Sequence, residues 1–111
     1  MKFTVVTILP ELIEPSLVAG VVGRAREAGV ITVETINPRD FTRDRHRTVD
    51  DTPYGGGPGM VMKPEPLVAA IEHAATVDRP RRILLSARGA RFDQARARAL
   101  AAEPSLLLVC G

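Results

Sequence analysis

The sequence has the length and composition of one small globular domain: 111 residues and 12.0 kDa, with 45% apolar and 25% charged side chains. This composition excludes a collagen-like chain and an acidic disordered tail. The single cysteine, Cys110, excludes a disulfide scaffold and fits a reducing, cytoplasmic setting. No apolar run approaches the roughly 20 residues of a membrane-spanning helix, so no membrane attachment is expected.

The net charge of +2 is unevenly distributed along the chain. Residues 79–111 contain seven arginines but only two acidic side chains. Guanidinium groups make bidentate contacts with phosphate, so a phosphate-rich partner fits this pattern. The alternative, which charge alone favours, is an ordinary solvated surface.

The first third of the chain predicts a strand–helix–strand unit. Residues 2–9 are β-branched and almost continuously apolar, which is typical of a strand buried on both faces. Pro15 separates a short turn from a helix over residues 16–28, and Gly29 ends that helix. Residues 30–36 place Ile31, Val33 and Thr35 on one side of an extended chain, which predicts a second strand. The two strands need a crossover connection, so they should be parallel.

The rest of the chain continues the alternation of strands and helices. Residues 37–59 fit neither regular element and predict a long loop. The elements expected after it are a short extended piece over 60–62, a helix over 64–77, a strand over 82–86, a helix over 93–103 capped by Asp93, and a strand over 106–110. The apolar stripe of the first helix comprises Leu67, Val68, Ala70, Ile71 and Ala74. This order predicts an α/β fold, a parallel sheet with helices on both faces.

The last predicted strand, over 106–110, is almost wholly apolar, as central parallel strands are. Such a strand needs a helix on each face, and ligands in open α/β sheets bind at the loops that follow such strands. Only Gly111 follows this strand here, which leaves no residues for that loop or for a covering helix. We therefore expect residues 1–111 to be a truncated domain, the N-terminal part of a longer protein.

The most specific local motif is the glycine-rich stretch Gly55–Gly59, which prolines stiffen. It lacks the Gly-Lys-Ser/Thr of a phosphate-binding P-loop. It also does not lie between the first strand and helix, where a dinucleotide-binding fingerprint would be. A plain surface loop is the alternative. The neighbouring Tyr54 offers a stacking face for a base, or else packs its ring on the domain.

A run of alternating charges from Arg43 to Asp51 precedes the glycine-rich stretch. Such runs are typical of solvated surfaces. The functional alternative is a basic approach to RNA phosphates, with Asp50 or Asp51 accepting a hydrogen bond from a base edge. His46 and the nearby aspartates match no standard spacing of metal ligands, so no metal is expected.

Two predicted strand ends carry small polar residues: Ser86–Gly89 follows one strand, and Cys110-Gly111 ends the next. Side by side, two such ends would form a crevice for a small ligand, although ordinary connecting turns are the alternative. Cys110 has no cation nearby in sequence to lower its pKa, so we interpret it as a small core residue rather than a nucleophile.

Five stretches carry a resemblance to a known family: Thr7–Glu11, Gly23–Glu27, His46–Asp51, Pro53–Pro66 and Leu108–Gly111. Together they resemble the bacterial tRNA (guanine-N1)-methyltransferases of the TrmD type, in the SPOUT class, over the whole chain. The resemblance implies a trefoil-knotted α/β domain that works as a homodimer. It implies S-adenosylmethionine as methyl donor and the guanine 3′ of the tRNA anticodon, at position 37, as acceptor.

The resemblance also implies which residues contact each substrate. Donor contacts fall on Leu85, Ser86, Ala87, Gly89, Cys110 and Gly111. Guanine-side contacts fall on Asp50, Tyr54, Gly55, Gly56, Gly57, Pro58 and Gly59. The family often has Pro and Gln where Ala87 and Arg88 stand here.

The catalytic base implied by the resemblance, an aspartate that takes the proton from guanine N1, lies beyond Gly111 in a helical C-terminal domain. Residues 1–111 would then be an incomplete donor-binding domain that contains no catalytic residue and is inactive alone. The alternative hypothesis is a non-catalytic α/β module that binds RNA or a nucleotide and ends naturally at residue 111.

Overall fold

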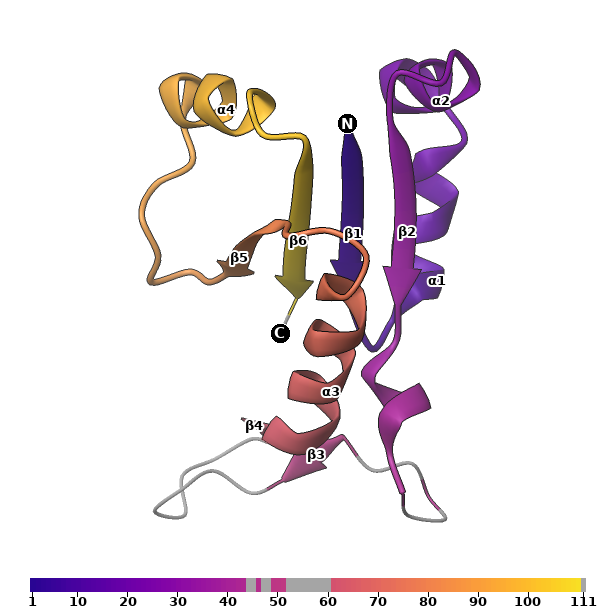
Figure 1. Cartoon of the computed structure of the whole chain (residues 1–111), viewed down its shortest axis with the longest axis vertical. Coiled ribbons are helices and arrows are strands. Elements are labelled where there is room, and N and C mark those ends of the chain that lie inside the picture. The colour runs from indigo at the N-terminus through magenta and orange to yellow at the C-terminus, as the bar shows by residue number, and fades with distance from the viewer. Residues whose placement is uncertain (44–45, 47–48, 52–60, 111) are drawn as a thin grey trace.

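The computed structural model describes residues 1–43, 46, 49–51 and 61–110. Its centre is a four-stranded parallel sheet with the order β2-β1-β6-β5 (Figure 1). These strands are β1 (Lys2–Val6), β2 (Thr32–Ile36), β5 (Arg81–Leu85) and β6 (Ser105–Cys110). Because all four run in one direction, their carboxyl ends lie along the same edge of the sheet.

The two central strands, β1 and β6, form the core as their apolar sequences predict. Val6 pairs in register with Val109, and both side chains are buried. On the same face, Leu107 is fully buried, with 0% of its surface exposed. Val5, which points to the opposite face, is buried as well. The prediction of a first strand buried on both faces is therefore confirmed, although the strand ends at Val6 rather than residue 9.

Helices cover both faces of the sheet. On one face, Ala70 and Ala74 of α3 (Pro64–Ala75) pack against Val6 and Leu107 (Figure 1). On the other, Thr35 of β2 donates a hydrogen bond from Oγ1 to Glu14 Oε1 at 3.4 Å, in the N-terminal helical region. The predicted α/β class, a parallel sheet with helices on both faces, is confirmed.

The N-terminal helical region differs from the single helix predicted over residues 16–28. It consists of α1 (Pro10–Ile13), a 3₁₀ helix η1 (Glu14–Leu17) and α2 (Gly20–Glu27). The longer helix begins only at Gly20, because Ala19 is extended and Gly20 has a φ of 65°. Gly29, with a φ of 74°, follows the end of α2 as predicted.

The long loop predicted over residues 37–59 is wrong in part. A 3₁₀ helix η2 (Pro38–Phe41) follows β2, and Asn37 caps it by accepting a hydrogen bond from the Arg39 N–H at 3.0 Å. A short hairpin follows, in which β3 (Asp50–Asp51) pairs antiparallel with β4 (Val61–Met62). β4 confirms the short extended piece predicted over residues 60–62, whereas η2 and β3 are too short for sequence periodicity to reveal.

The α3 and α4 helices are slightly shorter than predicted. α3 ends at Ala75 rather than residue 77, and its predicted apolar stripe is correct except for Val68, which is 48% exposed. α4 (Gln94–Ala101) starts at its predicted cap, where Asp93 Oδ1 accepts a hydrogen bond from the Arg96 N–H at 2.8 Å. Among the described residues, no helix has the length and apolar character that crossing a membrane requires.

Candidate functional site

The carboxyl ends of β5 and β6 lie side by side, as the parallel arrangement predicts. Leu85, the last residue of β5, pairs in register with Cys110, the last residue of β6. The expected donor residues at these two strand ends are therefore brought together. Gly111, the other expected donor contact on this edge, lies outside the described residues.

The turn after β5 is a compact structure held by its own hydrogen bonds. The Gly89 N–H donates to the Ser86 carbonyl oxygen at 3.2 Å, and the Arg88 N–H donates to Ser86 Oγ at 3.2 Å. A Cβ atom added at Gly89 would lie 3.3 Å from that carbonyl oxygen, so the tight turn favours glycine. Ser86, Ala87 and Gly89 are all exposed, which leaves this turn open to a ligand.

A hollow of about 580 Å³ opens beside β5, the loop after it and α4; we call it the β5–α4 hollow. Four expected donor residues line it: Leu85, Ser86, Ala87 and Gly89. Sequence reasoning missed the other lining side chains, which include Arg81, Arg82, Arg91, Phe92 and Arg96. The only signal of them was the excess of arginine after residue 79. Cys110 borders Leu85 in the sheet but is not among the lining residues.

Cys110 lies at the end of β6, next to the buried residues of the core but not among them. Its thiol is free and half-buried, and burial raises the pKa of that thiol above its ordinary value. A thiol with a raised pKa stays protonated at neutral pH and is a poor nucleophile. The raised pKa agrees with the interpretation that Cys110 is not a nucleophile, whereas its partial burial places it at the margin of the core.

On the guanine side, the structure describes Asp50 alone among the expected residues. It pairs in register with Met62 across the β3–β4 hairpin and is half-buried. The Lys63 N–H donates to the Val49 carbonyl oxygen, which ties the hairpin to the start of α3. The expected contacts from Tyr54 to Gly59 lie outside the described residues.

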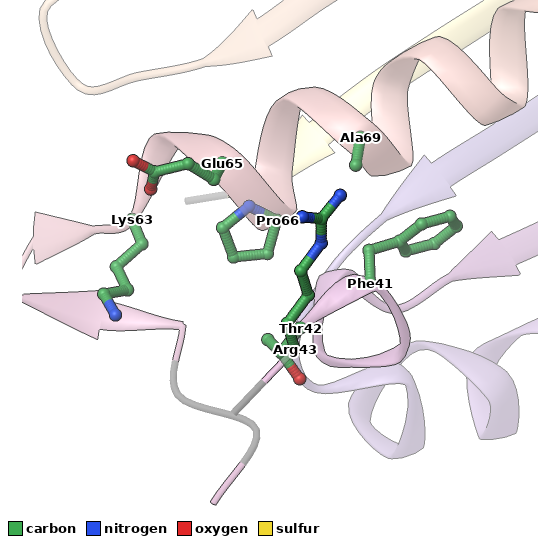
Figure 2. Close-up of a pocket in the computed structure, with 7 residues that line it drawn as sticks. All are labelled: Phe41, Thr42, Arg43, Lys63, Glu65, Pro66 and Ala69. Atoms are coloured by element: carbon green, nitrogen blue, oxygen red, sulfur yellow. The ribbon is translucent and has the colours of Figure 1, made fainter. Parts of the chain in front are cut away.

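A second cavity, of about 460 Å³, lies between η2 and the first turns of α3; we call it the η2–α3 cavity (Figure 2). Its lining residues are Phe41, Thr42, Arg43, Lys63, Glu65, Pro66 and Ala69. In Figure 2 the Arg43 side chain extends toward Ala69, and its guanidinium lies between Pro66 and Phe41. Sequence reasoning singled out Arg43 as an approach to phosphates but missed the cavity.

The η2–α3 cavity contains two cationic side chains, Arg43 and Lys63, and one carboxylate, that of Glu65. Neither Arg43 nor Lys63 forms an ion pair within the part of the chain that the structure describes. His46 is exposed, and no group of three or more His, Cys, Asp or Glu side chains within the described ranges could hold a metal ion.

The parallel four-stranded sheet with helices on both faces defines the class of this chain as an α/β domain. The structure superposes on the crystal structure of tRNA (m1G37) methyltransferase from Aquifex aeolicus with a TM-score of 0.89 and 31% sequence identity. The superposition covers 98% of this chain and 50% of that one.

A family model described as tRNA (Guanine-1)-methyltransferase TrmD matches residues 1–111, so the chain belongs to this family. Two relatives named tRNA (guanine-N(1)-)-methyltransferase come from Methylococcus capsulatus and Oleidesulfovibrio alaskensis, and are 56% and 53% identical over 100% of this chain. The chain spans only 45% and 26% of these two relatives. The family resemblance stated from the motifs is confirmed.

Proposed function

We propose that residues 1–111 are the donor-binding part of an enzyme that transfers a methyl group from S-adenosylmethionine to N1 of guanine 37 in tRNA. The observation that carries this proposal is the paired end of β5 and β6, where Leu85 and Cys110 are in register beside an exposed turn. The family membership and the names of the relatives support the reaction and the tRNA substrate. Because this acceptor is a tRNA, we propose that the enzyme works in the cytoplasm.

The residues at this edge fit a nucleoside-type donor. Leu85 is 51% exposed and supplies apolar surface, while the open backbone of the Ser86–Gly89 turn supplies hydrogen-bonding groups. The β5–α4 hollow has a volume suited to a small ligand. When bound, S-adenosylmethionine supplies an electrophilic methyl group. The proposed donor contacts are Leu85, Ser86, Ala87, Gly89, Cys110 and Gly111.

The acceptor side needs residues beyond those of this chain. Asp50 and the stretch Tyr54–Gly59 are proposed to contact the target guanine. N1 of guanine must lose its proton as the methyl group arrives, so a general base is required. We propose that an aspartate outside residues 1–111 is this base, and that a homodimer completes the site. The trefoil knot of the whole domain belongs to the same proposal.

The test uses the full-length protein, S-adenosylmethionine labelled on the methyl group and a tRNA transcript with guanine at position 37. We expect label to enter this tRNA and not a matched transcript with adenine at that position. A primer-extension stop at position 37 locates the modification, because a methyl group on N1 blocks base pairing. Absence of transfer to the guanine-containing transcript contradicts the proposal, as does activity in residues 1–111 alone.

A further inference from the structure

The η2–α3 cavity is separate from the residues assigned to the donor. We propose that it holds one nucleotide of the tRNA anticodon loop other than guanine 37, with the phosphate at Arg43 and Lys63 and the base against the apolar wall. This inference rests on the proposed function, because it assigns a further contact to the same substrate.

The two cations of the cavity come from different elements of the fold. Arg43 follows η2, and Lys63 is the N-cap residue of α3 (Figure 2). Within the described part of the chain neither is paired with a carboxylate. A guanidinium can bind a phosphate through two parallel hydrogen bonds, and an ammonium adds a point charge. Together they match the charge of an RNA backbone.

The remaining lining suits a planar base better than a small inorganic anion. Phe41, Pro66 and Ala69 give the cavity an apolar wall, and its volume of about 460 Å³ is within the range of pockets for organic ligands. Single-stranded RNA is recognised by stacking of splayed bases on aromatic side chains and on guanidinium planes. The exposed carboxylate of Glu65 can accept hydrogen bonds from amino groups on a base edge.

The walls of the cavity are held in place before any ligand arrives. Thr42 Oγ1 donates to the Arg39 carbonyl oxygen at 2.8 Å, which fixes the end of η2. Phe41 packs against the core, and its ring centroid lies 5.4 Å from that of His73 in α3. Pro66 is buried within the first turn of α3. Preformed walls lower the entropic cost of binding a nucleotide.

The η2–α3 cavity lies at the same edge of the sheet as the proposed donor contacts. η2 follows the carboxyl end of β2, and the Ser86–Gly89 turn follows the carboxyl end of β5, so both lie at the same edge of the parallel sheet. β2 and β5 are the two outer strands. A strand of RNA lying along this edge can therefore reach both the donor and the η2–α3 cavity. Asp50, which is expected to contact the guanine, belongs to the β3–β4 hairpin, and Lys63 directly follows that hairpin.

The charge contribution is tested by measuring the affinity of the full-length protein for a tRNA transcript at several salt concentrations. We expect Arg43→Gln/Lys63→Gln to weaken binding about tenfold. The slope of log K against log salt should fall by about 0.7 for each phosphate that the variant no longer neutralises. The matched control is Lys2→Gln/Arg98→Gln, which removes the same two charges from β1 and α4. Lys2 loses only a partly exposed ion pair of 3.8 Å to Glu34, so this control should fold normally.

The base contribution is tested by filling the cavity. Ala69→Leu adds apolar volume without changing charge, and Ala69→Ser keeps the cavity open. We expect only the leucine variant to weaken tRNA binding. A tRNA with an abasic site at the cavity nucleotide should lose affinity for the wild type. That loss should not add to the effect of Ala69→Leu, because the variant and the abasic site remove the same contact. Full additivity for every anticodon-loop position would overturn the base contact.

The outcomes separate this inference from the proposed function. If the wild-type protein methylates guanine 37 but Arg43→Gln/Lys63→Gln binds tRNA as tightly as the control, only the inference is overturned. Equal weakening in both double variants also overturns it, because total charge alone would then explain binding. If the wild type transfers no methyl group, the proposed function fails. An unchanged affinity for S-adenosylmethionine in the variants, with weakened tRNA binding, supports the cavity as an RNA contact.

Discussion

The central strand β6 and the edge strand β5 of the same sheet both contain a run of apolar residues but differ in burial. Leu107 of β6 is fully buried between β1 and α3, whereas Leu84 of β5 is 68% exposed. Both belong to runs of apolar residues in parallel strands. The difference comes from position, because β6 has a strand on each side and β5 has one.

This comparison shows how one sheet separates stability from binding. The centre is stabilised by packing of large apolar side chains, as in Val6, Leu107 and Val109. The edge leaves leucine side chains and the Ser86–Gly89 turn accessible beside a hollow lined by arginines. Substitutions at the centre should therefore act on folding, and those at the edge on ligand binding.

The largest expected effect is at the centre of the sheet. Leu107→Ala in the full-length protein should lower the free energy of unfolding by about 3 kcal/mol, because it removes buried methyl groups and leaves a cavity. Leu84→Ala, the matched substitution at the edge, should cost less than about 1 kcal/mol. Denaturant titrations followed by circular dichroism measure both. Equal losses of stability would contradict the difference between the buried centre and the exposed edge, and would show that β5 is covered in the full-length protein.

A smaller effect is expected at the start of α4. Asp93→Ala removes the side-chain cap on the Arg96 N–H and should cost about 1 kcal/mol, whereas Asp93→Asn keeps an acceptor and should cost less. α4 buries none of its residues, so little packing compensates for the missing cap. Hydrogen exchange of the α4 amides should therefore accelerate in the alanine variant. Unchanged protection would show that α4 is held by contacts other than its cap.

The sequence was sufficient to predict the centre of the fold. Long apolar runs identified β1 and β6, and the strand–helix–strand order required parallel pairing. Local chemistry identified the Asp93 cap, because capping involves residues only three apart. The extended piece predicted over residues 60–62 corresponds to β4, whereas η2 and β3 were not predicted, because each has too few residues to establish a period. The pairing of Asp50 with Met62 was not predicted either, because the glycine-rich stretch between them was interpreted only as a loop.

The candidate site also has one part that the sequence predicted and one part that it did not. Placement of Leu85 beside Cys110 follows from the rule that parallel strands end at one edge. The lining of the η2–α3 cavity could not be predicted, because Phe41 and Pro66 are distant in sequence and meet only after η2 packs on α3. The arginines around the β5–α4 hollow were visible as a charge excess, but their convergence depends on the path of the loop before α4.

A further prediction concerns the turn at the edge of the sheet. Gly89→Ala places a Cβ atom 3.3 Å from the Ser86 carbonyl oxygen, so the turn must shift by a few tenths of an ångström. We expect this shift to weaken S-adenosylmethionine binding about two- to fivefold, a loss of about 0.4–1 kcal/mol. Calorimetric titration of the full-length protein measures this change, with Ala28→Gly, at the exposed end of α2, as the control. An unchanged Kd in Gly89→Ala would indicate that the Ser86–Gly89 turn does not contact S-adenosylmethionine.

The smallest expected effect is the pH dependence at Cys110, where the centre of the sheet meets its ligand-binding edge. Burial raises the thiol pKa in the folded state, so the folded protein holds this proton more tightly than the unfolded chain does. The contribution to stability is complete below the unfolded pKa of about 8.5 and is lost as pH rises through the folded pKa. Iodoacetamide should therefore label Cys110 more slowly at pH 8 than it labels the denatured protein. Equal rates would indicate an open edge, and S-adenosylmethionine should slow the labelling further if the donor covers Cys110.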